Sequence, residues 1–253
     1  QLLIYQITPA LPDTLHSGDV IYSPSWSPAN DRIIYAGTTH QEGNLWSLSI
    51  EGGSPEPFDT GGMAAFHLDW SRDGQWIAFQ SSPGPHIFLV SAGGGQPVRV
   101  SDPEHMSGAC TVAWAFDNET VMFSGHPLGS GLQAQLAKVD TSGDNKQILT
   151  PVSEGASAPW GKPSWSPDER EIAFVRAAED TSVCIIDLAT EKVRQLVQGR
   201  SPAWSPNGDE IAFVDDDIIW MISTDGSGEP VPVTLELNPG GLRDLVWSPD
   251  GEW

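Results

Sequence analysis

Six polar residues occupy one repeated position of this chain, three residues before a tryptophan. They are Ser23, His67, Thr111, Lys162, Ser201 and Asp244. Together they offer both donors and acceptors of hydrogen bonds, so a fold that gathers them can bind a polar ligand. The residues two positions before the same tryptophans are apolar in all six cases, such as Leu68 and Val112. In an extended segment the six polar side chains therefore share a side, and we call them the polar ring.

The tryptophans that follow the polar ring each begin a recurring phrase, which is most complete at Trp204-Ser205-Pro206-Asn207-Gly208. The six tryptophans are Trp26, Trp70, Trp114, Trp165, Trp204 and Trp247. Their successive spacings are 44, 44, 51, 39 and 43 residues. A period of this length, with several short strands in each unit, predicts the blades of a β-propeller.

The phrase describes a tight turn. Serine first, proline second and aspartate or asparagine third are typical of a type I turn. The fourth position holds glycine or asparagine in five repeats, and these residues tolerate a left-handed backbone. Glu169 is the exception, so we expect either local strain or a different turn there.

A β-type triplet follows each turn, as in Ile211-Ala212-Phe213, and two further short apolar strands complete a repeat. The middle residue of the triplet is often alanine, which favours close packing of one sheet on the next. We therefore predict an all-β fold, a six-bladed β-propeller of four-stranded antiparallel blades, forming a single domain over residues 1–253. Residues 3–7 and 14–16 would supply the third and fourth strands of the sixth blade, which both termini would share. An open arc of a larger ring is the alternative.

The charge of the chain narrows the choice of partner. It holds 34 acidic and 12 basic residues, a net charge of -22. Nucleic acid and anionic membranes are repelled by such a surface, whereas a basic protein patch suits it. No apolar run approaches the ~18 residues of a membrane span. Cys110 and Cys184 fall in different repeats, which favours two free thiols over a disulfide.

A propeller has two faces with different connections. We call the end with the first-to-second and third-to-fourth strand turns the turn face, and the opposite end the loop face. The loop face has the variable connections, where binding usually lies. There we expect His105, His126 and Trp160, the last as an exposed aromatic anchor unless it packs on its own loop. The polar ring would line the upper axial channel, or merely hydrate it.

Metal and cofactor chemistry find little support in the sequence. No His-x-His, His-Glu-x-x-His or Cys-x-x-Cys spacing occurs, so we predict no metal site and no cofactor. The acidic hairpin at Asp215, Asp216 and Asp217 lacks the alternating spacing of a calcium loop. It is better interpreted as a solvated turn.

The pattern Trp-Ser-Pro-Asp-Gly-x-x-Ile-Ala-Phe resembles the repeat of TolB-type six-bladed β-propellers, and it covers nearly the whole chain. The resemblance implies a role in protein binding outside the cytoplasm. The α/β domain that precedes the TolB propeller has no counterpart in this sequence. Related repeats occur in prolyl oligopeptidase-type peptidases, which use a Gly-x-Ser-x-Gly elbow. Here Ser130 is flanked directly by two glycines, the wrong spacing for that elbow.

We therefore expect a non-enzymatic scaffold that recognises a protein or peptide partner on the loop face. It would be periplasmic, secreted or on the cell surface, and part of a longer chain. Two alternatives stay open. One is the propeller domain of a prolyl oligopeptidase-like hydrolase, and the other is a carbohydrate-active propeller with a histidine cluster.

Overall fold

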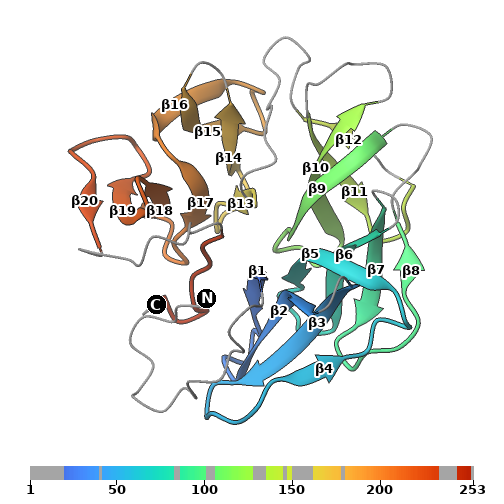
Figure 1. The fold of residues 1–253 in the computed structure, drawn as a ribbon. Coiled ribbons are helices and arrows are strands. Elements are labelled where there is room, and N and C mark those ends of the chain that lie inside the picture. Colours follow the sequence, from blue (N-terminus) through green and yellow to red (C-terminus); the bar gives the residue numbers. More distant parts are fainter. Residues whose placement is uncertain are drawn as a thin grey trace.

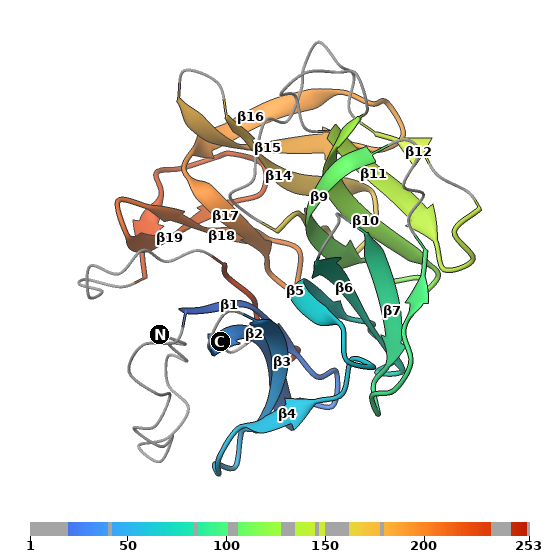
Figure 2. The ribbon, with the colours of Figure 1, turned by 45° about the vertical axis from the view of Figure 1, so that its right-hand side comes forward.

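A computed structural model describes residues 20–39, 42–82, 86–100, 106–127, 135–144, 147–149, 162–177, 180–233 and 244–251. These residues form five four-stranded sheets, and in each sheet the strands pair antiparallel in sequence order. The sheets stand around a common centre like the blades of a propeller (Figures 1 and 2). The innermost strands of neighbouring blades contact one another, as β1 contacts β5 and β5 contacts β9.

Within each blade the strands follow one another from the axis outward. Blade 1 contains β1 (Val20–Trp26), β2 (Arg32–Thr39), β3 (Glu42–Ser49) and β4 (Glu56–Phe58). Blade 2 contains β5 (Ala64–Trp70), β6 (Trp76–Ser82), β7 (Ile87–Ser91) and β8 (Val98–Arg99). Blade 3 contains β9 (Met106–Trp114), β10 (Thr120–Pro127), β11 (Gln135–Asp140) and β12 (Gln147–Ile148). Blade 4 contains β13 (Ser164–Trp165), β14 (Glu171–Ala177), β15 (Thr181–Asp187) and β16 (Val193–Gln198). Blade 5 contains β17 (Arg200–Trp204), β18 (Glu210–Asp215), β19 (Ile218–Ser223) and β20 (Val231–Pro232).

The prediction of a six-bladed propeller needs correction, because the described residues form five complete blades. The sixth repeat contributes residues 244–251, which carry a turn but no strand. This segment still occupies the sixth position, passing between β17 and β1 (Figure 1). Trp247 Nε1 donates to the carbonyl of Ala203 at 3.0 Å, and the backbone N–H of Ser23 donates to Asp244 at 2.9 Å. The strands expected from residues 3–7 and 14–16 lie outside the described residues.

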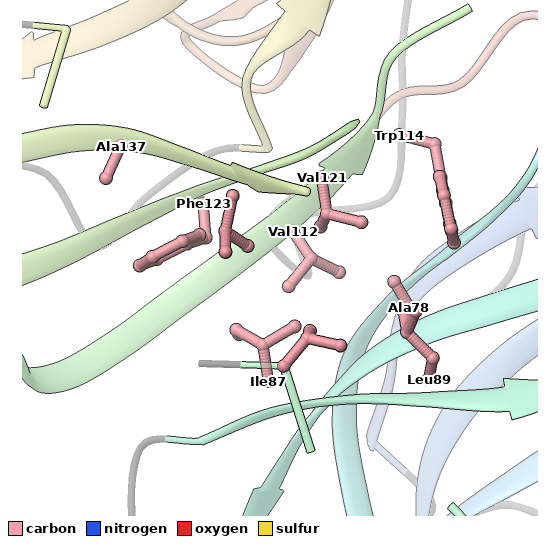
Figure 3. Packing of buried hydrophobic residues seen from close by; sticks show 10 residues of the cluster. Ala78, Ile87, Leu89, Val112, Trp114, Val121, Phe123 and Ala137 are labelled. Carbon is pink, nitrogen blue, oxygen red and sulfur yellow. The ribbon is translucent and has the colours of Figure 1, made fainter. Parts of the chain in front are cut away.

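Adjacent blades are joined by apolar cores in which a tryptophan meets the preceding blade. Trp114 lies in one cluster with Ala78, the middle residue of the β6 triplet, as Figure 3 shows. Trp204 shares a cluster with Ala173 of β14 in the same way. At these two interfaces the small middle residue leaves room for the indole ring. Trp70 and Trp165, by contrast, share their clusters with the larger middle residues Ile34 and Met122. Burying a side chain of this size contributes about 3 kcal/mol or more.

In five of the six repeats the turn begins with a serine, and its side chain bonds within the turn. Ser71 Oγ donates to Asp73 at 2.6 Å and accepts the backbone N–H of Trp76 at 2.9 Å. Ser166 does the same with Asp168 and with the backbone of Glu171. Serine suits the first turn position because its hydroxyl is both donor and acceptor, and aspartate suits the third because it accepts from that hydroxyl.

The fourth turn residue is left-handed in every repeat. The φ angles are 57° at Asn30, 74° at Gly74, 58° at Asn118, 59° at Glu169, 86° at Gly208 and 74° at Gly251. Glu169 therefore adopts the same turn as the other repeats. Of the two expectations for this position, local strain is the one that fits, and a different turn is not. One of its carboxylate oxygens is also buried without a hydrogen-bond partner among the described residues.

Replacing Glu169 by glycine should raise the free energy of unfolding by about 1 kcal/mol. Removing Cβ relieves the left-handed strain, and the greater freedom of glycine in the unfolded chain offsets part of the gain. Urea denaturation of Glu169→Gly and Glu169→Ala measures the effect. The alanine variant retains Cβ and the strain, so equal stabilisation by both would assign the cost to the buried carboxylate instead.

Candidate functional site: the axis of the propeller

Irregularities in the innermost strands decide where the polar ring lies. Ser23, His67 and Ser201 have positive φ angles of 50°, 32° and 53°. The pairing register of β1, β5 and β17 with the next strand shifts at these positions. Such bulges redirect a side chain away from simple alternation. The two-residue period alone therefore does not give the direction of these side chains.

Three members of the polar ring meet across neighbouring repeats. Ser23 Oγ lies 3.0 Å from His67 Nδ1 and 3.4 Å from Asp244 Oδ2, to which the backbone N–H of Ser23 also donates. Burial lowers the pKa of His67, and the nearby Asp244 carboxylate partly offsets that effect. This chain of contacts joins the C-terminal segment to blades 1 and 2.

The other ring members lie in different surroundings. Thr111 Oγ1 is 2.9 Å from Ser124 Oγ within blade 3. Ser201 is buried. Lys162 reaches across to Asp69 of blade 2 in an ion pair. His105 and Trp160 lie outside the described residues, as does the side chain of His126, so their roles remain predictions.

Asp69 is the centre of a second network that sequence reasoning missed. Its carboxylate accepts from Ser25 Oγ at 2.9 Å, from the backbone N–H of Trp114 at 2.7 Å, and from Lys162 Nζ. The side chains of Asp69 and Lys162 are 16% and 13% exposed. Because the pair is largely buried, each charge depends on the other for compensation.

A polar residue stands directly before three of the tryptophans and has a structural purpose of its own. Ser25 Oγ accepts the backbone N–H of Trp70 at 3.0 Å, and Ser164 Oγ accepts that of Trp204 at 2.9 Å. Asp69 does the same for Trp114. A polar side chain from one blade thus satisfies a backbone donor of the next. The signal in the sequence was the recurrence of serine or aspartate directly before tryptophan.

A cavity of about 410 Å³ lies at the turn-face end of the axis. All six repeats line it through the tryptophan, the residue before it and the residue two positions after it. Lys162 is the one member of the polar ring in this lining, and Asp69 lies beside it at the cavity wall. The expectation that binding occurs on the loop face rests largely on loops outside the described residues.

The residue two positions after the tryptophan varies around this cavity. Four repeats place proline there, namely Pro28, Pro167, Pro206 and Pro249. Blades 2 and 3 place Arg72 and Phe116 instead, and the Arg72 guanidinium carbon lies 4.2 Å from the centre of the Phe116 ring.

Acidic turn residues surround the cavity. They are Asp31, Asp73, Asp117, Asp168 and Asp250, and all are exposed. The Ser166 hydroxyl and the backbone N–H of Arg170 lower the pKa of Asp168. A hydrogen bond from Ser27 lowers the pKa of Asp31, helped by Arg32. The turn face is therefore negatively charged at neutral pH around a less acidic centre.

Metal centres and membrane-spanning helices are features that the sequence already disfavoured. Within the described ranges, no three His, Cys, Asp or Glu side chains gather as metal ligands would. The side chain of Cys184 is buried. In the part of the chain that the structure describes, no helix has the length and apolarity needed to cross a bilayer.

Comparison with known proteins supports the fold. No family model matches the chain. A protein of Agrobacterium fabrum without an assigned function is 28% identical over 165 residues, covering 61% of this chain and 54% of that protein. The chain therefore matches only about half the length of this curated relative.

Solved structures give broader coverage. A protein assigned as TolB from Agrobacterium tumefaciens superimposes with a TM-score of 0.76 at 22% identity, over 93% of this chain and 88% of that one. TolB from Acinetobacter baumannii superimposes with a TM-score of 0.68 at 23% identity, over 84% of this chain and 54% of that one. An oligogalacturonate lyase in complex with manganese superimposes with a TM-score of 0.65 at 13% identity, over 92% of this chain and 70% of that one. The chain is thus an all-β propeller with TolB-type structural neighbours.

Replacing His67 by asparagine should remove part of the pH dependence of stability. The folded protein holds His67 at a lowered pKa, whereas the unfolded chain binds a proton near pH ~6.5. Stability is therefore full above about pH 6.5 and is lost as the pH falls toward the folded pKa. Asparagine retains a polar atom near the position of Nδ1 but does not titrate.

Chemical denaturation at pH 7.5 and pH 5.5 tests this expectation. Wild type should lose more stability than His67→Asn between these values. Titratable groups away from this network contribute equally to both proteins, so the difference reports on His67 together with its partner Asp244. Equal losses in the two proteins would show that His67 is not held neutral by the fold.

Replacing Lys162 by methionine should lower the free energy of unfolding by about 2 kcal/mol, because Asp69 then stays largely buried without its cation. The double variant Lys162→Met, Asp69→Asn should regain part of that loss. Its amide oxygen can still accept the backbone N–H of Trp114. Urea denaturation of the two single variants and the double variant gives the coupling energy. Strict additivity would show that the ion pair does not act as a unit.

Proposed function

We propose that this protein is a non-enzymatic binding scaffold whose axial cavity on the turn face receives a segment of a protein partner. The observation that carries the proposal is the cavity of about 410 Å³, to which all six repeats contribute. Half of its lining residues are tryptophan or proline, and its one acidic residue, Asp69, is already paired. Concave, mostly apolar sites with a few polar groups are typical binding sites.

The rigidity of the walls supports this proposal. The lining tryptophans are fixed by inter-blade packing and by backbone hydrogen bonds to the preceding blade. A partner segment would therefore meet a preformed surface, and ordering costs on the scaffold side would be small. The exposed aspartates around the cavity would attract basic residues that flank the bound segment.

The loop face is the alternative surface for the same function. Its support is the expected variability of the connections and the candidate residues His105, His126 and Trp160. The resemblance to TolB-type repeats favours protein binding on either surface. It also favours a location outside the cytoplasm, in the periplasm, on the cell surface or in the medium. Likeness to an oligogalacturonate lyase is a likeness of fold, so we do not extend its activity to this chain.

Selection of peptides from a displayed random library against the immobilised protein tests the proposal. Two matched variants of blade 4 discriminate the surfaces. Pro167→Lys alters the turn-face rim, and Thr181→Lys adds the same charge at an exposed position near the loop face. Selected peptides should lose at least tenfold in affinity for Pro167→Lys and remain unchanged for Thr181→Lys. The reverse result would place binding on the loop face.

A further inference from the structure

One corner of the axial cavity departs from the repeat in a way that the fold does not require. Four repeats present proline two positions after the tryptophan, and three of these prolines lie beside the glycine of the next turn, as Pro167 does beside Gly208. Arg72 and Phe116 stand at this position in two adjacent blades. Proline would serve the turn better, because it fixes the backbone of the second turn residue.

The geometry of Arg72 leaves it able to bind. Its guanidinium carbon lies 4.2 Å from the centre of the Phe116 ring, and Arg72 is exposed. An aromatic ring beneath a guanidinium restrains its plane but leaves the N–H groups at the edge. Across the described ranges, no carboxylate forms an ion pair with Arg72. By contrast, Arg170, also near the turn face, pairs with Asp168.

The charge of the cavity differs from that of the protein. The ionisable residues in its lining are Asp69, Arg72 and Lys162, two cations against one acid. Lys162 and Asp69 form an ion pair, so Arg72 is the cation of the lining that has no ion-pair partner among the described residues. The whole chain has a net charge of -22. At physiological salt the attraction between Arg72 and an anion is screened beyond about 8 Å. Arg72 therefore selects an anionic group only when that group is already inside the cavity.

We propose that Arg72 and Phe116 form a carboxylate-binding corner that receives an acidic side chain of the partner segment. This inference rests on the proposed function, since it names the chemistry that the cavity selects. The guanidinium edge would bind the carboxylate through two parallel hydrogen bonds. An apolar side chain next to that carboxylate would lie against the tryptophan and proline walls.

The lining favours a polypeptide over an acidic saccharide. The serine hydroxyls in the cavity wall are already engaged within the protein. Ser25 donates to Asp69, Ser164 accepts from the backbone of Trp204, and Ser205 bonds with Asn207 and Glu210. Few serine hydroxyls of the lining are then left to bind sugar hydroxyls.

Two blocked dipeptide amides test the corner, N-acetyl-Phe-Glu-amide and N-acetyl-Phe-Gln-amide. They are nearly isosteric and differ in one carboxylate. Titration followed by nuclear magnetic resonance of the tryptophan indole N–H groups gives the affinities. The Glu peptide should bind about tenfold more tightly, as expected for hydrogen bonds to a charged group. Arg72→Gln should abolish that preference, whereas Arg170→Gln, the matched control, should keep it.

Several results would contradict the proposal that Arg72 and Phe116 bind a carboxylate. Equal affinity of the two dipeptides, no binding of either, or equal effects of the two arginine variants would each do so. Glucuronate binding more tightly than the Glu peptide, with the same dependence on Arg72, would assign the corner to a saccharide. Thermal denaturation of Arg72→Gln checks that the variant is folded. Library peptides that need the cavity but contain no acidic residue would refute the corner while leaving the proposed function intact.

Discussion

The docking of each tryptophan onto the preceding blade is the interaction on which the rest of the structure depends. A propeller blade contacts only its neighbours, so the ring is as stable as its inter-blade interfaces. Between blades 2 and 3, for example, the indole ring of Trp114 packs over Ala78, a small strand residue. The backbone N–H of the same tryptophan is bound by a side chain of the preceding blade. One residue therefore sets both the spacing of the blades and the wall of the axial cavity.

Most residues of the repeat are needed for turns and for packing between blades. Positions that depart from the repeat are therefore the candidates for a functional role. Serine, aspartate and glycine at the turns are explained by hydrogen bonds and backbone angles. The ion pair between Asp69 and Lys162 and the stacked pair of Arg72 and Phe116 have no equivalents in the other described blades. Both line the same cavity.

The local part of the fold was predictable from sequence. Period, turn type and the packing role of the strand triplet follow from backbone rules that act within a few residues. Whether the sixth blade is complete was not predictable in this way, because its strands would have to come from both ends of the chain. The cavity was missed for a related reason. Asp69 and Lys162 are 93 residues apart, and the bulges at Ser23 and His67 change side-chain directions that a two-residue period assumes.

The acidity of the chain has more than one cause, and this affects what it says about partners. The third turn residue is acidic in several repeats because it accepts the serine hydroxyl, as Asp73 and Asp168 do. Part of the net charge is therefore a by-product of turn chemistry repeated around a ring. Basic residues carry more information, since the chain has only 12 of them. A cation retained at a position where the fold favours proline needs a reason other than the turn, and recognition of an anionic group supplies one.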